Sequence, residues 1–583
     1  MRRSSVRVIT AISCLLYGTA ASRLSSYSSS NFTAQAQTAQ PVAVASPVAG
    51  QSAHVKPVSA TISTSPKPAA IPAMQPTAAP GTEIYSAKRG EAISTIARRY
   101  VGKTSYLTSS ELAEAIRKVN GNRTANILKA NENVVIPGIL PAPIVEKTVP
   151  VAKDFEVRAI YLTGIMAASD HGLRVIRHWR EVGGNAVVFD IKDSDGSVNI
   201  PFEHPLLGKH QVYIHDVPKF VHFLHSQNMH AIARIAIFRD ERLVKEHPEL
   251  AVQSKRTKQP WRENGKLVWT DPSNPNVQEY NIALAKYVAQ LGADEIQFDY
   301  VRFPAEGDQK DAGFVFQSEH PDTNQAADST SPLAVVENSG SDCTTPAAKR
   351  RKNTAHGASR GTGVQNGQAP EGRKNGCDAA SAHSATPRGP QRSDVITAFL
   401  KKAYAEIHPA GALLSLDVFG VMAWQRPVDL SHTGQDIVGM AKYCDVLSPM
   451  IYPSHFFGMD NIAHPGDAPE HFIGESMARF ELITKGSGVV IRPWLQAFRW
   501  RTKTYSPEYI KVQVLTAKEK GGIGFLFWNA ANDYSKPYAA MPEMKTANAK
   551  EKDKFFRGDE LPARSFSADL MPTTNPPATS SNR

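Results

Sequence analysis

The sequence predicts an α/β protein whose main domain is a (β/α)8 TIM barrel. Eight apolar runs alternate with amphipathic helical stretches across residues 156–540. Buried parallel strands read as continuous apolar runs, and eight β/α units in succession close a barrel. A doubly wound open sheet is the alternative, but no Gly-x-Gly-x-x-Gly motif follows the first run.

The expected barrel elements follow directly from these runs. The strands are Val157–Ile165, Ala186–Ile191, Ala231–Ile237, Glu295–Val301, Ala412–Phe419, Val446–Tyr452, Val489–Leu495 and Ile523–Trp528. Helices are expected over His171–Glu181, Val217–Gln227, Val277–Leu291, Ser393–Ile407, His471–Ile483 and Pro507–Lys520, where apolar residues recur at helical spacing.

Composition agrees with a large folded core. Of the 583 residues 41% are hydrophobic and 21% are charged, which excludes global disorder and a coiled coil. The net charge is +11, and no acidic residue precedes Glu83. Because no basic patch is interleaved with aromatic residues, nucleic acid is not the expected partner.

The first 36 residues resemble an export signal. Arg2, Arg3 and Arg7 precede the short apolar run Val8–Ala21, which is followed by small-residue cleavage sites. The run is too short to span a bilayer comfortably, and no later segment has 18 apolar residues. We therefore expect a mature chain without a transmembrane segment, in the periplasm, the cell envelope or the extracellular space.

Four segments have the composition of linkers. Residues 37–82 are rich in Pro, Ala and Ser, residues 139–155 form a second linker, and residues 541–583 form a polar tail. Residues 318–391 are a low-complexity insertion after the fourth strand. Such segments cannot bury enough apolar surface to offset their ordering entropy, so disorder is expected.

Residues 83–138 predict a small β-α-α-β domain. The pattern that carries this prediction combines Tyr85, the run Gly90-Glu91-x-Ile93-x-x-Ile96-Ala97, Asn120 and the ending Val135-Ile136-Pro137. These residues resemble a LysM domain. Asn131 stands where that family usually has Gly, and Asn tolerates a left-handed backbone better than most residues. The resemblance implies binding of N-acetylglucosamine-containing glycans, most often peptidoglycan; the alternative is a spacer without a ligand.

Polar and aromatic residues follow the barrel strands where an active site is expected. Three carboxylates, Asp190, Asp299 and Asp417, come at the ends of the second, fourth and fifth strands. Carboxylates surrounded by aromatic rings suit a sugar, whose faces stack on Trp and Tyr. The candidate substrate-binding residues are Lys192, Tyr300, Arg302, Tyr452, Trp494, Gln496, Trp528 and Asn529.

Glycoside hydrolysis uses two carboxyl groups, which retaining enzymes hold about 5–5.5 Å apart. Asp299 and Asp417 end neighbouring strands, so we assign Asp299 as nucleophile and Asp417 as general acid/base with a raised pKa, and keep Asp190 as a third candidate. Either Arg302 or Lys192 is expected to keep the nucleophile ionised. The alternative is that one of these carboxylates only caps a loop or pairs with an arginine.

Neither a metal nor another cofactor is expected. The cysteines, Cys14, Cys343, Cys377 and Cys444, lack zinc-site spacing, and no His-Glu-x-x-His motif occurs. The run Asp193-Ser194-Asp195-Gly196 lacks the remainder of a calcium-binding loop and predicts a polar turn.

Three motifs in the barrel region resemble a family of bacterial glycoside hydrolases with a TIM-barrel fold. They are Phe189-Asp190-Ile191-Lys192-Asp193, Gln297-Phe298-Asp299-Tyr300-Val301-Arg302-Phe303-Pro304 and Ser448-Pro449-Met450-Ile451-Tyr452-Pro453. The resemblance implies hydrolysis of a polysaccharide, and a neighbouring LysM domain implies that this polysaccharide belongs to the cell wall. Two alternatives remain: a non-catalytic wall-binding or scaffolding protein, and a metal-dependent deacetylase-like enzyme, which the absence of an Asp/His-x-x-x-His cluster disfavours.

Overall fold

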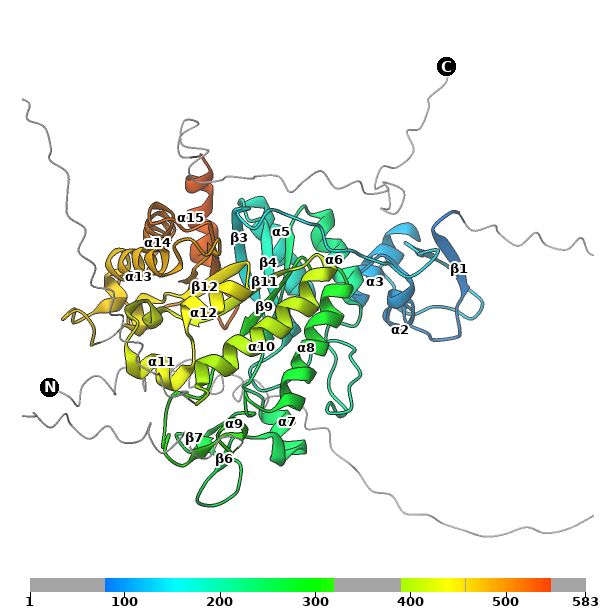
Figure 1. Cartoon of the computed structure of the whole chain (residues 1–583). Helices are drawn as coiled ribbons and strands as arrows, with labels where there is room; N and C mark the ends of the chain where they lie inside the picture. The colour runs from blue at the N-terminus through cyan, green and yellow to red at the C-terminus, as the bar shows by residue number, and fades with distance from the viewer. Residues whose placement is uncertain (1–78, 319–388, 457, 547–583) are drawn as a thin grey trace, which may run out of the picture. The chain divides into compact units, whose positions relative to one another are not determined.

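The computed structural model describes residues 79–318, 389–456 and 458–546. They include a small N-terminal α/β module and a barrel of strands with helices around it (Figure 1). The predicted signal peptide, most of the first linker, most of the 318–391 insertion and most of the tail lie outside the described residues, as do Cys14, Cys343 and Cys377. In the part of the chain that is described, no helix is long and apolar enough to cross a bilayer.

Residues 79–140 fold in the predicted order of strand, helix, helix and strand. The strands pair antiparallel, and both helices pack an apolar face onto a shared core that includes Ile96, Leu112 and Ile136. The elements are β1 (Thr82–Ser86), α2 (Ile93–Tyr100), α3 (Ser109–Val119) and β2 (Asn133–Pro137).

Two asparagines shape this module. Asn131 has a φ of 61°, the left-handed conformation that its place in the pattern requires. The side-chain amide of Asn120 donates to the carbonyls of Ile116 and Val135, and its oxygen accepts the N–H of Val135. Asn120 therefore joins the end of α3 to β2.

Eight parallel strands close into a ring, which confirms the predicted barrel. The strands are β3 (Val157–Leu162), β4 (Ala186–Lys192), β5 (His230–Ala236), β9 (Glu295–Asp299), β11 (Leu413–Phe419), β12 (Val446–Met450), β14 (Trp494–Gln496) and β15 (Gly524–Trp528). They follow one another around the ring in this order, and β15 pairs back onto β3. The seventh predicted run is divided at Pro493, which has no N–H to donate; the piece before it, β13 (Val490–Ile491), also pairs with β12.

Helices cover the outside of the ring, with α8 and α10 in front in Figure 1. The helices of residues 156–546 are, in chain order, α4 (Gly164–Ala167), α5 (Asp170–Glu181), α6 (Val217–Ser226), α7 (Glu241–Glu246), α8 (Pro275–Gln290), α9 (Val315–Ser318), α10 (Arg392–Ile407), α11 (Pro427–Thr433), α12 (Ile437–Met440), α13 (Pro469–Thr484), α14 (Pro507–Glu519) and α15 (Ser535–Thr546). Two short antiparallel pairs lie in the loops: β6 (Gln253–Ser254) with β10 (Ala312–Gly313), and β7 (Arg262–Glu263) with β8 (Leu267–Val268).

Side chains alternate between the barrel interior and the helix layer, because successive strand residues point to opposite faces. On β9, Phe298 points outward and stacks on Phe399 of α10, with ring centroids 5.9 Å apart. Its neighbours Gln297 and Asp299 bond to other strands across the interior. The alternation therefore delivers polar side chains to the inside of an otherwise apolar strand.

The interior is mostly apolar on one side of the ring and mostly polar on the other, and Tyr161 of β3 and Asp190 of β4 join the polar side through Arg234. The strands β15, β3 and β4 contribute Val157, Ala159, Val188 and Leu526. The strands β5, β9, β11 and β12 contribute the buried residues Arg234, Glu295, Gln297, Asp299, Ser415, Asp417 and Ser448.

A buried ion pair holds the polar side together. Glu295 accepts two hydrogen bonds from Arg492, at 2.8 and 3.0 Å, and its carboxylate lies 3.1 Å from the ring of His230. All three side chains are fully buried. Burial by itself would raise the pKa of Glu295, but Arg492 and His230 outweigh it and hold that pKa at about 2.

Removing this charge should destabilise the barrel strongly. We expect Glu295→Gln to lower the free energy of unfolding by about 3–5 kcal/mol, because Arg492 is left buried without its counter-charge. Urea unfolding at neutral pH measures the loss. The matched control is Glu519→Gln, whose side chain is 72% exposed and should change stability by no more than about 0.5 kcal/mol. Equal stability of the two variants would show that the barrel does not depend on the pair of Glu295 and Arg492.

The same ion pair gives a pH dependence. The pKa of Glu295 is about 2 in the folded protein against an ordinary value of 4.5, so its stabilisation is complete above 4.5 and is lost as the pH falls toward 2. Unfolding measured between pH 5 and pH 2 should therefore show a steeper loss of stability in the wild type than in Glu295→Gln.

Candidate functional site

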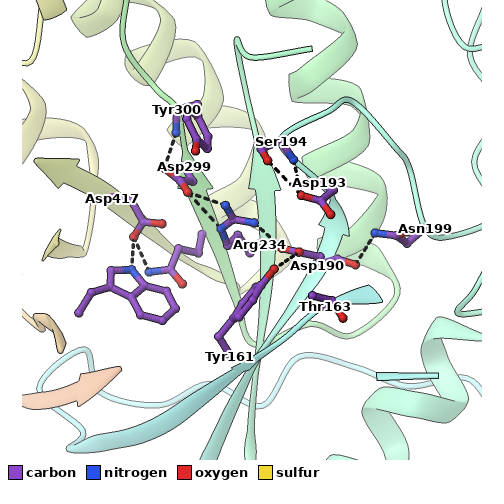
Figure 2. A network of polar contacts seen from close by, with 12 residues as sticks. Tyr161, Thr163, Asp190, Asp193, Ser194, Asn199, Arg234, Asp299, Tyr300 and Asp417 are labelled. Carbon is purple, nitrogen blue, oxygen red and sulfur yellow. Dashed lines mark hydrogen bonds and ion pairs between the residues drawn. The ribbon is translucent and has the colours of Figure 1, made fainter. Parts of the chain in front are cut away.

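Three buried carboxyl groups meet at the C-terminal end of the barrel, with one arginine between two of them. Figure 2 shows Arg234 of β5 lying between Asp190 of β4 and Asp299 of β9. Its Nη2 donates to Oδ2 of Asp299 at 2.6 Å, its Nε reaches the same oxygen at 3.2 Å, and its Nη1 donates to Asp190. Charge-assisted bonds of this kind are about twice as strong as neutral ones, so Arg234 fixes both carboxylates in place.

Asp299 accepts a further hydrogen bond from its own loop. The N–H of Tyr300 donates to Oδ1 at 2.6 Å, so hydrogen bonds reach both oxygens of the carboxylate. Tyr300 has a φ of 54°, which is uncommon for an aromatic residue and ends β9 two residues before the predicted end of the strand. Strained residues of this kind cluster at functional sites.

Asp417 lies on the neighbouring strand, in a different environment. Phe298 pairs with Leu416, the residues directly before the two carboxylates, and adjacent strands run about 4.8 Å apart. Trp494 Nε1 donates to Oδ1 of Asp417 at 2.6 Å, and Gln297 Nε2 donates to the same oxygen at 2.8 Å. Burial, followed by the nearby charge of Asp299, raises the pKa of Asp417 well above its usual range.

Asp190 completes the group. It bonds to Arg234 and accepts the phenolic O–H of Tyr161 on β3. Burial raises its pKa to about 7, although Arg234 and the Tyr161 bond act in the opposite direction. The end of the barrel thus combines carboxyl groups with clearly different surroundings, the arrangement that separates acid and base roles.

A small pocket opens onto Asp299 and Asp417. The guanidinium of Arg302 lies in its wall between two aromatic rings, 4.5 Å from the centroid of Trp269 and 4.5 Å from that of Phe419. The other lining residues are Tyr300, Gln435 and Met450.

A second small pocket shares Phe419 and Met450 with the first and is also lined by Tyr452 and His455. Tyr452 contacts Trp528, with ring centroids 6.0 Å apart, and Trp528 stacks on Tyr161 at 6.3 Å. Aromatic rings therefore extend from the carboxyl group of Asp190 to the second pocket.

The structure brings most of the predicted site residues together. Asp190, Asp299 and Asp417 share one end of the barrel, and Tyr300 and Arg302 line the pocket beside the last two. Trp494 contacts Asp417 directly, while Tyr452 and Trp528 form the aromatic wall.

Lys192 lies elsewhere, so the expectation that it keeps the nucleophile ionised is wrong. A β-bulge between Asp190 and Lys192 shifts the register, which sends the lysine to the outer face of β4. There it pairs with Asp240 at 2.7 Å and donates to Asn281 of α8 at 3.0 Å. Arg302 does not take the role either, because Arg234 is the cation that contacts Asp299.

Gln496 and Asn529 organise loops. Gln496 accepts the N–H of Ser454 and donates to the carbonyl of Phe498. Asn529 donates to two backbone carbonyls and accepts the N–H of Ala531. Their polar atoms are thus occupied by the backbone of the barrel's own loops.

Arg234, Tyr161 and Gln297 belong to this network but are not among the site residues predicted from the sequence. The signal was present for the arginine: it is the one charged residue inside the run Ala231–Ile237. A charged residue within a buried strand requires a partner, and strands on either side of it carry aspartates.

Among the described residues, no group of three or more His, Cys, Asp or Glu side chains could hold a metal ion. The turn Asp193-Ser194-Asp195-Gly196 is stabilised by hydrogen bonds within it, since Oδ1 of Asp193 accepts the N–H and the hydroxyl of Ser194.

Comparison with known proteins identifies a family. The sequence profile of the family described as "Putative glycosyl hydrolase domain" matches residues 159–534, which span the barrel from β3 to the start of α15. No curated protein matches the sequence.

Several solved structures are similar to parts of the chain. A hypothetical protein from Ruminiclostridium thermocellum ATCC 27405 is 38% identical over 27% of this chain and 80% of its own, with a TM-score of 0.25. The PgaB (BpsB) glycoside hydrolase domain from Bordetella bronchiseptica is 12% identical over 66% of this chain and 99% of its own, with a TM-score of 0.42. An α-galactosidase from Thermus thermophilus, TtGalA, is 12% identical over 74% of this chain and 69% of its own, with a TM-score of 0.37. Since these TM-scores are below 0.5, the strand pairings themselves establish the fold.

The arginine at the end of the barrel should be essential for stability. We expect Arg234→Met to lower the free energy of unfolding by about 3–5 kcal/mol, because Asp190 and Asp299 are left buried without a counter-charge. The control Arg242→Met removes an arginine that is 54% exposed and 3.5 Å from Asp195, where a surface pair contributes about 0–1 kcal/mol. Denaturant unfolding compares the two, and a small loss in Arg234→Met would show that the carboxyl groups do not depend on it.

Proposed function

The chain belongs to this glycosyl hydrolase family, and we propose that it cleaves O-glycosidic bonds of a cell-wall or extracellular polysaccharide with Asp299 and Asp417. The observation that carries the proposal is that two carboxyl groups in one pocket have different surroundings. Asp299 is bound by the guanidinium of Arg234 and by a backbone N–H, whereas Asp417 is buried with a raised pKa. In this proposal Asp299 acts as the carboxylate and Asp417 as the acid.

The reaction follows from these states. Asp417 donates its proton to the glycosidic oxygen while Asp299 attacks the anomeric carbon, which breaks the glycosidic bond and forms a glycosyl ester. Asp417, now a carboxylate, removes a proton from water, and the hydroxyl attacks the anomeric carbon and releases Asp299. The sugar leaves with retained configuration, and both carboxyl groups return to their first state.

Asp190 and the aromatic residues have supporting roles in this proposal. Asp190 and Tyr161 hold Arg234 from the side opposite Asp299. Tyr452 and Trp528 present rings beside the carboxyl groups, and such rings can bury the apolar face of a sugar.

The proposal extends to where the enzyme acts. The basic and apolar pattern of residues 1–36 supports export to the periplasm, the cell envelope or the outside of the cell. The β-α-α-β order of residues 79–140, with Asn131 in the left-handed conformation and Asn120 joining α3 to β2, supports a LysM-like module that binds an N-acetylglucosamine-containing glycan such as peptidoglycan.

Substitution of either carboxyl group should abolish cleavage. We expect Asp299→Asn and Asp417→Asn each to reduce the release of reducing sugar from peptidoglycan or another bacterial polysaccharide by at least about 10²-fold. The control is Asp154→Asn, because Asp154 is exposed and lies just before the barrel, and this variant should retain full activity. If the wild type binds these glycans and cleaves none of them, a non-catalytic binding protein becomes the better explanation of the same pocket.

The acid role of Asp417 predicts a pH dependence. Activity requires its protonated form, so the rate should fall as the pH rises through the raised pKa of Asp417. Trp494 donates to the carboxylate and thereby lowers that pKa, so Trp494→Phe should raise it further and move the alkaline limb of the rate profile to higher pH. A limb that stays in place, or moves to lower pH, would contradict the assignment.

A further inference from the structure

A larger, basic pocket lies beside the aromatic wall, at the same end of the barrel. Its volume is about 560 Å³, and it is formed by the loops that follow β12 and β14. The lining residues are Ser454, Ala463, His464, Pro465, Gly466, Asp467, Arg499, Trp500, Arg501, Thr502 and Lys503.

Positive charge dominates this pocket. Arg499, Arg501 and Lys503 are exposed and alternate along one loop, which places three cations against the single acid Asp467, a net charge of 3 − 1 = +2. Asp467 is already occupied: the hydroxyls of Thr502 and Thr504 and the N–H groups of Lys503 and Thr504 all donate to its Oδ1, at 2.7 to 3.1 Å. Its role is to hold the basic loop in shape.

The two loops fit closely, so the pocket is preformed. A Cβ on Gly466 would lie 2.2 Å from the carbonyl oxygen of Arg501, which means that only glycine allows this approach. Arg501 has a φ of 47°, and its guanidinium lies 4.6 Å from the centroid of Trp500. A preformed cationic wall binds without the cost of ordering a mobile loop.

Aromatic rings connect this pocket to the carboxyl groups. The ring of Trp500 lies 4.9 Å from that of His455, which lies 5.4 Å from Tyr452. His455 and Tyr452 line the second pocket, which shares Phe419 and Met450 with the pocket of Asp299 and Asp417. The three pockets therefore follow one another along the end of the barrel.

We infer that the substrate is an anionic polysaccharide, whose carboxylate or phosphate groups bind Arg499, Arg501 and Lys503 while its sugar rings lie along the aromatic residues that lead to Asp299 and Asp417. This inference rests on the proposed glycosidase function, because it extends the same substrate chain away from the cleavage point. Arginine matches carboxylate and phosphate geometry, and Trp500 offers a ring for the sugar that carries the charge.

Binding by a catalytically silent protein tests the inference. The full chain with Asp299→Asn is compared with the same chain carrying Arg499→Gln, Arg501→Gln and Lys503→Gln. A matched control carries Lys401→Gln, Lys442→Gln and Lys485→Gln, three exposed cations elsewhere on the barrel, so that each set of three substitutions removes the same charge of +3. The probes are polygalacturonate for carboxylate, wall teichoic acid for phosphate, dextran as a neutral chain and chitosan as a cationic one.

The Asp299→Asn chain should bind polygalacturonate or teichoic acid more tightly than dextran. The Arg499/Arg501/Lys503 variant should lose at least about tenfold in affinity and part of its salt dependence, while the control loses neither. The stronger of the two anionic probes identifies the charged group. Equal binding of all four probes, preference for chitosan, or the same affinity in both triple variants would overturn the inference.

Activity separates this inference from the proposed function. Where wild type cleaves the preferred anionic glycan, the Arg499/Arg501/Lys503 variant should raise KM and leave kcat nearly unchanged. Anion-dependent binding without cleavage would support the basic pocket and contradict the glycosidase. Cleavage of neutral glycans that does not depend on Arg499, Arg501 and Lys503 would support the glycosidase and contradict the basic pocket as a substrate-binding site.

Discussion

The ion pairs of Arg234 are the interaction on which the rest of the site depends. Asp190, Asp299 and Asp417 lie at one end of a barrel where each is at most 8% exposed. Burying an isolated carboxylate is very unfavourable, and several of them close together would repel one another. Arg234 contacts two of the three, whereas Asp417 has no contacting cation among the described residues, and burial raises its pKa well above its usual range. Burial also raises the pKa of Asp190, to about 7, although Asp190 contacts Arg234.

The architecture of the sheet makes this arrangement possible. Strand alternation brings Gln297 and Asp299 inward from β9 while Phe298 anchors the same strand to α10. The left-handed backbone at Tyr300 then turns the chain so that its N–H meets Asp299. Farther along the interior, the pair of Glu295 and Arg492 allows β9 to remain polar on its inner face. The apolar interior residues of β15, β3 and β4, such as Leu526, Ala159 and Val188, supply the packing that these charges do not.

Much of the fold could be predicted from the sequence, because buried parallel strands are continuous apolar runs. Every predicted run overlaps an observed barrel strand, and Asp190, Asp299 and Asp417 lie together as their positions at strand ends suggested. The errors arise where a single residue changes the local geometry. The β-bulge after Asp190 moves the Lys192 side chain to the outer face of β4, and no sequence pattern predicts this bulge.

Other features depend on tertiary contacts. Asn529 resembles a substrate ligand in sequence, yet its amide is used by nearby backbone groups. Arg234 is a charged residue inside an apolar run, which indicates a buried partner but does not identify it. The structure identifies the partners as Asp190 and Asp299, which are 44 and 65 residues away in the chain and lie on either side of Arg234.

The protonation state of Asp417 is the central claim, and infrared spectroscopy measures it directly. The difference spectrum between the wild type and Asp417→Asn at neutral pH should contain the carbonyl band of a protonated carboxylic acid that the variant lacks. A difference spectrum with only carboxylate bands would show that Asp417 is ionised in the resting protein. It could not then serve as the acid, and the division of roles between Asp299 and Asp417 would fail.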